Sequence, residues 1–371
     1  MAVATRETID ALPEAKGTDV GQTSQFTLMR RRFMQSKLSV FGCIALFLLY
    51  AAAILSSFLA PYPYDQPDSN NVLRPPTAVK LSGVGLAVCG STQHLNTGTF
   101  TWEYSIDCNK SVPINFFGQG YQYKLFGFIP TDRHLFTVNG RQKVYLLGTD
   151  NEGRDMLARI LFGARISLSI GLVGVAISTI IGAILGTASG YFGGAWDNVM
   201  QRVIELLLSM PTLSVWMAVG AALPETTTVV QRYFLITLIL ATIGWTGLAR
   251  QVRGKVMGYR SQDYTSAARL AGASHWRIIT RHLMPNSMSH IIVTAALAVP
   301  ATILAETSLS FLGFGMLPPA VSWGVLLKNA QQIQVVEQHV WLMIPGALVV
   351  FAVTCFLLIG DGLRDAVDPY G

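Results

Sequence analysis

Long runs of apolar residues dominate the pattern of the chain, and they predict membrane-spanning helices. A helix that crosses the hydrocarbon core of a bilayer needs about 20 mostly apolar residues. Six stretches with few or no charged residues approach or meet this length: 39–60, 166–190, 203–222, 233–249, 288–314 and 340–360. We therefore expect an all-α membrane protein with six transmembrane helices, because six buried core helices of this kind would be unusual in a soluble domain.

Composition and charge agree with a membrane protein. Hydrophobic residues make up 51% of the chain and charged residues only 13%, whereas soluble domains carry about 25% charged residues. A net charge of +6 would suit either nucleic acid or an anionic membrane surface. We favour the membrane, because the charges cluster beside the apolar runs.

Orientation follows from the basic residues, since Lys and Arg in short loops favour the cytoplasmic side. They cluster before the first run and after the fourth: Arg30, Arg31, Arg32 and Lys37, then Arg250, Arg253, Lys255, Arg260, Arg269, Arg277 and Arg281. We expect a multi-pass protein of the bacterial inner (plasma) membrane with both termini in the cytoplasm. The first run is too long for the core of a signal peptide, so we interpret it as an uncleaved anchor.

The chain divides into four parts on this reasoning. We expect a disordered cytoplasmic tail at 1–28, an N-terminal transmembrane helix at 29–62, an extracytoplasmic insertion at 63–147, and a core with five transmembrane helices at 148–371. The insertion should be partly β: residues 121–128 are aromatic and partly alternating, and an Asn-Gly pair at 139–140 predicts a hairpin between 134–138 and 141–147.

The four cysteines fall into two classes. Cys43 and Cys355 lie in predicted membrane helices, where a thiol packs as a small apolar group. Cys89 and Cys108 lie in the insertion, which faces an oxidising compartment. We expect a disulfide between them, with two free thiols as the alternative. No His/Cys spacing resembles a metal site, so we expect no metal and no cofactor of the chain's own.

Several predicted spans contain glycines on one helix face or prolines in their interior. Gly182, Gly186 and Gly190 share one helix face, which lets a second helix approach closely, either within one bundle or between subunits. Pro211, Pro300 and Pro345 should kink or interrupt their helices.

Three local expectations concern charged and aromatic side chains. The i,i+4 spacing suggests a pair between Asp155 and Arg159, and Glu205 should pair with its neighbour Arg202. Trp323 and Trp341 should lie in the aromatic belt at the membrane interface.

The most informative segment is the basic loop 250–286, RQVRGKVMGYRSQDYTSAARLAGASHWRIITRHLMPN. Its pattern is helical: Ser261 or Asp263 can cap a short helix, and Gly272 can end it. A second amphipathic stretch leads to Pro285. A short helix presented on the cytoplasmic face is a natural docking element.

This loop resembles the "EAA" loop of ABC importer permeases, in which Glu-Ala-Ala is followed by Gly and then Pro. Ala267, Ala268, Gly272 and Pro285 match in type and order, while Ser266 stands where the family usually has Glu. The resemblance implies a coupling helix that sits in a cleft of an ATP-binding subunit. The implied coupling residues are Asp263, Tyr264, Ser266, Ala267, Ala268, Gly272, Ala273 and Pro285.

Other segments are similar to permeases of the dipeptide, oligopeptide and nickel importers. They are GTDNEGRDMLARILFGARISL at 148–168, LSFLGFGMLPPAVSWG at 309–324 and GDGLRDAVDP at 360–369. The resemblance, to the second or "C-type" permease subunit, implies the type I permease fold with an insertion between helices 1 and 2. It also implies a homologous second permease, two ATP-binding subunits and a periplasmic or lipid-anchored solute-binding protein.

The chain has no GxxxxGK[ST] loop, so ATP hydrolysis must come from partners, and no catalytic set suggests an enzyme. We expect half of a pore for peptides or similar small solutes. Alternatives within the family are nickel chelates, glutathione and sugar-like solutes. An ion-coupled secondary transporter is disfavoured because charges lie near the ends of the spans, and a membrane-anchored receptor or enzyme is disfavoured by the absence of a catalytic set in the insertion.

Overall fold

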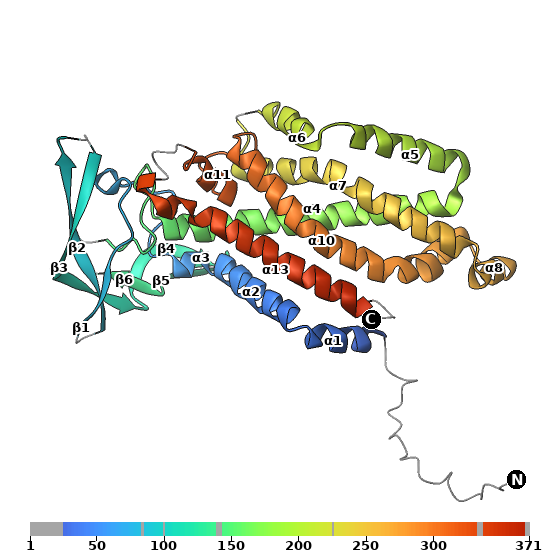
Figure 1. The fold of residues 1–371 in the computed structure, drawn as a ribbon, viewed down its shortest axis with the longest axis horizontal. Helices are drawn as coiled ribbons and strands as arrows, with labels where there is room; N and C mark the ends of the chain where they lie inside the picture. Colours follow the sequence, from blue (N-terminus) through green and yellow to red (C-terminus); the bar gives the residue numbers. More distant parts are fainter. Residues whose placement is uncertain are drawn as a thin grey trace, which may run out of the picture.

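The computed structural model describes residues 25–82, 85–98, 101–138, 143–224, 226–331 and 337–367 of the chain. Long helices form an elongated bundle, with the strands gathered at one end and the short helix α8 at the other (Figure 1). We call these the sheet end and the α8 end. The predicted tail lies almost wholly outside the described residues.

The helical elements follow the apolar runs along the chain. The α-helices are α1 (Gln25–Gln35), α2 (Lys37–Ile54), α3 (Ser56–Leu59), α4 (Met156–Phe192), α5 (Gly194–Ser209), α6 (Thr212–Ala221), α7 (Val229–Arg260), α8 (Asp263–Leu270), α9 (His275–Ile278), α10 (Met284–Phe311), α11 (Trp323–Lys328) and α13 (Ile344–Val367). Short 3-10 turns lie at Ser69–Asn71 and Val340–Met343, and a π-helical turn at Ile279–Leu283 joins α9 to α10.

Within the described residues, five helical segments are long and apolar enough to cross a membrane: Lys37–Ile54, Met156–Phe192, Val229–Arg260, His275–Phe311 and Val340–Val367. A sixth candidate is the pair α5 and α6, which bends by 82°. The break falls at Pro211, as expected, because proline lacks the N–H of a helical residue and pushes Met210 into an extended conformation. Pro300 stays inside α10.

The glycine face of α4 packs against α7 of the same chain. A Cβ atom built on Gly182 would lie 2.8 Å from the carbonyl oxygen of Trp245, and one on Gly186 would lie 2.5 Å from that of Ala249. Gly190 makes the same close approach to Arg253, at 2.7 Å. Of the two interpretations left open by the sequence, packing within one bundle is therefore the one that the structure shows.

The strands lie between α3 and α4. They are β1 (Val79–Ser82), β2 (Gly85–Asn96), β3 (Thr101–Phe116), β4 (Gln119–Leu125), β5 (Ile129–Arg133) and β6 (Phe136–Val138). One antiparallel sheet has the order β1-β2-β3-β6, and β4 and β5 form a separate hairpin. Cys89 in β2 and Cys108 in β3 are joined by a disulfide, with their Cα atoms 4.3 Å apart.

The predicted hairpin after residue 134 is wrong. Residues 136–138 pair with β3 instead, and residues 143–147 form no strand. The backbone N–H of Val144 donates to the hydroxyl of Tyr62, and that of Tyr145 donates to Thr77, so the segment is bound by the chain before β1. The Asn139-Gly140 turn lies outside the described residues.

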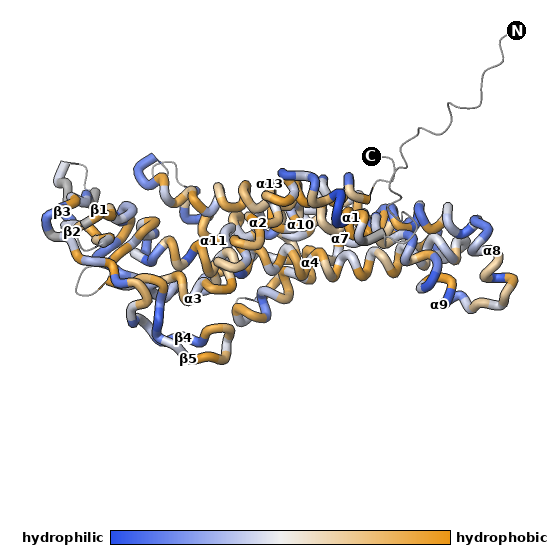
Figure 2. The backbone as a smooth tube through the Cα atoms, turned by 90° about the horizontal axis from the view of Figure 1, so that it is seen from below, coloured by the Kyte–Doolittle hydropathy of each residue, from blue (hydrophilic) through white to orange (hydrophobic). Residues whose placement is uncertain are grey.

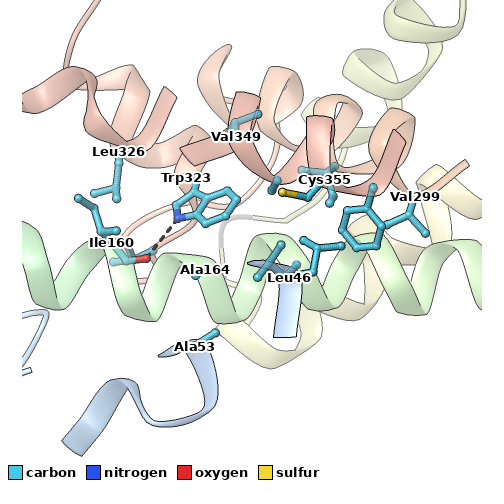
Figure 3. Close-up of a cluster of buried hydrophobic side chains, with 14 of the residues drawn as sticks. Leu46, Ala53, Ile160, Ala164, Val299, Trp323, Leu326, Val349 and Cys355 are labelled. Atoms are coloured by element: carbon cyan, nitrogen blue, oxygen red, sulfur yellow. Dashed lines mark hydrogen bonds between the residues drawn. The ribbon is translucent and has the colours of Figure 1, made fainter. Parts of the chain in front are cut away.

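Trp323 is at the centre of the core and not at a membrane interface. It is fully buried, and its indole N–H donates to the carbonyl oxygen of Ile160 at 3.2 Å (Figure 3). The ring packs among side chains of α2, α4 and α13, including Leu46, Ala164 and Val349. Because this core offers the indole its one hydrogen-bond partner, Trp323 needs no contact with water.

The charged residues at the start of α4 pair differently from the expectation. Arg159 contacts Asp150 at 3.0 Å rather than Asp155, and Arg154 contacts the same carboxylate at 2.9 Å. Asp155 instead caps α4 by accepting from the backbone N–H groups of Leu157 and Ala158. Burial raises the pKa of Asp155 to about 7. The predicted pair of Arg202 and Glu205 is confirmed at 2.9 Å.

Candidate functional site

The short helix α8 stands at the end of the bundle, beyond the last turn of α7 (Figure 1). Gln262 has an extended backbone conformation that separates α7 from α8, and Asp263 is the first residue of α8. Neither Ser261 nor Asp263 supplies a side-chain cap. Gly272 adopts a φ of +75° after α8, a conformation that favours glycine. The chain then turns into α9, which runs through a π-helical turn into α10.

Contacts with α7 and α10 fix the inner side of α8. Thr265 is buried, and its hydroxyl donates to the carbonyl oxygen of Tyr259 at 2.9 Å. The hydroxyl of Tyr264 accepts from the amide of Asn286 at 3.0 Å. Ala268 and Ala273 pack on a buried cluster formed by α4, α7 and α10. A displacement of α8 must therefore move the ends of two long apolar helices.

A second set of contacts ties the loop to the end of α4. The hydroxyl of Tyr191 lies 2.7 Å from Nδ1 of His275. The guanidinium group of Arg269 lies over the Tyr191 ring, 5.3 Å from its centroid, a geometry that attracts the cation to the ring face. The sequence did not point to Tyr191, because it is 84 residues from its partner.

An ion pair joins α5 and α7 near the α8 end of the bundle. Arg253 of α7 contacts both carboxylate oxygens of Asp197 in α5, at 2.5 and 2.6 Å. The hydroxyl of Ser189 donates to the same carboxylate at 2.5 Å. The pair links the turn between α4 and α5 to the helix that carries α8. Sequence reasoning missed it for lack of a local spacing signal.

The outer side of α8 and the following turn faces solvent and is partly apolar. Leu270 is 90% exposed and Trp276 is 74% exposed. The remaining predicted coupling residues fall into two groups: Asp263, Ser266, Ala267, Gly272 and Pro285 are exposed, and Tyr264, Ala268 and Ala273 are partly buried. Most of the predicted residues thus lie on α8 and in the turn that follows it, with large apolar side chains beside small ones, whereas Pro285 lies in α10. We call the exposed surface of Asp263, Ser266, Ala267, Leu270, Gly272 and Trp276 the α8 face.

A buried acid lies toward the sheet end of the bundle. Glu306 of α10 has no exposed surface and accepts hydrogen bonds from Ser167 at 2.9 Å and Ser310 at 2.7 Å. The Ser167 oxygen in turn accepts from the backbone N–H of Trp323. This network joins α4 and α10 to the first residue of α11. The sequence placed Glu306 in a span but gave no partner for it.

Together, these features define a membrane protein of several spans with a short, partly exposed helix bonded to the bundle at one end. The profile of the family of binding-protein-dependent transport system inner membrane components matches residues 159–370. A second profile, the N-terminal transmembrane domain of oligopeptide transport permease C, matches residues 24–76.

Several curated proteins are similar to the chain over much of its length. The oligopeptide transport system permease protein OppC of Mycobacterium tuberculosis is 35% identical over 346 residues, which cover 93% of this chain and 95% of that protein. OppC of Haemophilus influenzae is 40% identical over 66% of this chain and 76% of its own length. The dipeptide transport system permease protein DppC of Bacillus subtilis is 40% identical over 60% and 68%.

The chain belongs to the family of binding-protein-dependent transport system inner membrane components. It is a multi-pass permease subunit of an ABC importer, and it works in a complex with further permease, ATPase and binding-protein subunits. The resemblance drawn from the sequence motifs is thereby confirmed.

Proposed function

We propose that this chain is the second, C-type permease of an importer that carries peptides or similar small solutes inward. It forms half of the translocation pore, and a homologous permease forms the other half. The named relatives are peptide permeases, which supports peptides over nickel chelates, glutathione or sugar-like solutes. Two ATP-binding subunits supply the energy, and a periplasmic or lipid-anchored binding protein delivers the solute.

The α8 face is the docking surface for an ATP-binding subunit. The observation that carries this proposal is the exposure of Leu270 at the end of α8, whose inner side is bonded to the bundle, and of Trp276 in the neighbouring helix α9. An apolar side chain this exposed favours a partner that removes it from water. Since α8 contacts the ends of α7 and α10, force applied to it reaches two spans directly.

The distribution of basic residues supports a cytoplasmic location for the α8 end. Basic residues gather on α1 and along the end of α7, and α1 packs against α13. The positive-inside rule then puts both termini on the same side as α8. The bent pair of α5 and α6 counts as the sixth span, and residues 63–147 form an extracytoplasmic insertion whose disulfide between Cys89 and Cys108 suits an oxidising compartment.

The disulfide has a direct chemical test. Alkylation of the denatured protein without a reductant should modify only Cys43 and Cys355, and prior reduction should add two labels. Mass spectrometry of the insertion peptides reads the result. Labelling of Cys89 and Cys108 before reduction would refute the bond.

The function is tested by uptake of labelled dipeptides and oligopeptides in cells with and without the gene. Loss of uptake, restored by the wild-type gene but not by Gly272→Trp, is the expected result. A sharper pair of variants is Leu270→Asp and Leu81→Asp, which place the same charge on exposed leucines, 90% and 79% exposed, at opposite ends of the molecule. Only Leu270→Asp should abolish uptake. Peptide uptake that is independent of the gene would exclude peptides as the substrate and favour nickel chelates, glutathione or sugar-like solutes.

A further inference from the structure

The hairpin of β4 and β5 carries an apolar free end that the described part of the chain leaves uncovered. The turn between the strands has positive φ at Phe126 and Gly127, 53° and 85°. Phe126 is 57% exposed, Phe128 is 72% exposed and Ile129 is 45% exposed. No charged residue occurs between Lys124 and Asp132. We call residues 126–129 the apolar tip.

The base of this hairpin is attached to the first span. The backbone N–H of Leu135 donates to the carbonyl oxygen of Phe58 in α3 at 2.8 Å, and the rings of Phe58 and Phe117 lie 6.1 Å apart. Tyr121 of β4 also contacts His134, the residue after β5, with ring centroids 4.5 Å apart. These contacts fix the position of the base of the hairpin relative to α3, which directly follows α2.

The end of α2 marks a boundary of the hydrocarbon region. α2 exposes apolar side chains such as Phe47, 72% exposed, which have no place in water in such density. At its last turn the guanidinium group of Arg165 donates to the carbonyl oxygens of Ala53 and Ile54, at 3.3 and 2.9 Å. A charge at this position indicates the polar interface, because charges avoid the centre of a bilayer.

The hairpin thus starts where the bilayer interface lies. A strand rises about 3.3 Å per residue, so the four steps from Ile129 to Arg133 separate tip and base by roughly 13 Å. Figure 2 shows β4 and β5 beside α3, at the sheet end of the helical bundle, with hydrophobic residues toward the hairpin's free end. The hairpin of β2 and β3, in contrast, exposes polar residues such as Thr92 and Ser105 near its end.

We propose that the apolar tip inserts into the lipid interface at the sheet end of the bundle. Aromatic side chains concentrate at this level of membrane proteins because their rings tolerate the boundary between hydrocarbon and headgroups. The tip is a projecting turn, continuous through α3 with the lipid-facing surface of α2. Lipid is the occupant that this geometry favours over a partner subunit, since residues 126–129 carry no polar side chain that a protein interface would have to match.

A photoreactive residue reads the neighbour of the tip directly. p-Benzoylphenylalanine, which keeps the aromatic ring and adds a largely apolar benzoyl group, replaces exposed Phe128 in the complete importer reconstituted in phosphatidylethanolamine and phosphatidylglycerol vesicles. The same residue at Phe47 gives the reference yield for a lipid-facing site. Ile106 in β3, 53% exposed, is the matched control on the other hairpin.

Irradiation and mass spectrometry then distinguish the occupants. The expected result is a phospholipid adduct at Phe128 with a yield comparable to that at Phe47, and none at Ile106. An adduct between Phe128 and another subunit would overturn the proposal in favour of a protein interface. A lipid adduct at Phe47 with no adduct at Phe128 would overturn it in favour of a tip in water.

Discussion

Substitutions at Gly272 can separate the effect of backbone conformation in the loop 250–286 from the effect of side-chain size. Its φ is +75°, and an added Cβ would meet no atom within 4 Å. Gly272→Ala therefore causes no clash in the isolated subunit but forces an L-residue into the left-handed region. That conformation costs an L-residue roughly 1–2 kcal/mol, and an energy of this size changes a population by a factor of about 5–30.

A matched variant isolates the conformational effect. Asparagine adopts the left-handed region more readily than other residues with a side chain. Gly272→Asn should therefore keep most of the loop in its native shape, although its side chain is larger than that of alanine. We expect the amount of solute imported per ATP hydrolysed to fall in Gly272→Ala and to be largely retained in Gly272→Asn.

The assay is simultaneous measurement of uptake and phosphate release by the complete importer in proteoliposomes. Equal loss in both variants would show that space at the docked interface matters and not backbone conformation. Normal coupling in both would refute the role assigned to Gly272.

Three further predictions concern the bundle. Gly186→Leu should destabilise the detergent-purified protein by about 1–3 kcal/mol, the usual cost of overpacking, because a Cβ at this position lies 2.5 Å from the carbonyl oxygen of Ala249. Gly247→Leu is the control, since a Cβ there meets no atom within 4 Å, and thermal stability should be nearly unchanged. Glu306→Leu should destabilise the protein by about 1–3 kcal/mol for each serine partner left unpaired, while Glu306→Gln keeps an acceptor and should lose less in chemical denaturation. Burial raises the pKa of Asp155 from 3.8 to about 7. Between these values the folded state binds more protons than the unfolded state, so stability should fall as pH rises from about 4 to 7. Asp155→Asn should flatten this part of the plot of stability against pH, and an unchanged plot would contradict the raised pKa.

The spans could be predicted because hydropathy over 20 residues depends on composition and not on tertiary contacts. The bend at Pro211 was predictable for the same reason, since the constraint is local to the residue and its predecessor. The pair of Arg202 and Glu205 also follows from helical spacing alone. The glycine face of α4 predicted a close helix contact, but only the structure shows that its partner is α7.

Features that depend on distant parts of the chain were not predictable. Arg159 pairs with Asp150 because the turn before α4 folds back over the helix, which spacing within the helix does not reveal. Trp323 is buried because the bundle provides the carbonyl oxygen of Ile160 as an acceptor. The strand expected at 141–147 is absent from the described part of that range because the chain before β1 supplies its hydrogen bonds.

The candidate site shows the same division. Helical spacing and motif order located α8, and the preference of glycine for positive φ located the turn at Gly272, although neither predicted cap of α8 is present. The contact of Tyr191 with His275 and the ion pair of Asp197 with Arg253 join segments far apart in the chain. These contacts join α4 to α9 and α5 to α7 near α8, and local spacing in the sequence does not predict them.

The central claim is that ATP hydrolysis in partner subunits drives import through this chain by way of the α8 face. The most direct test is uptake of a labelled oligopeptide by proteoliposomes that contain the complete importer, with and without ATP and the ATPase subunits. We predict uptake only when both are present, and its loss in Leu270→Asp. Uptake of the same size without the ATPase subunits would contradict the account and favour an ion-coupled transporter.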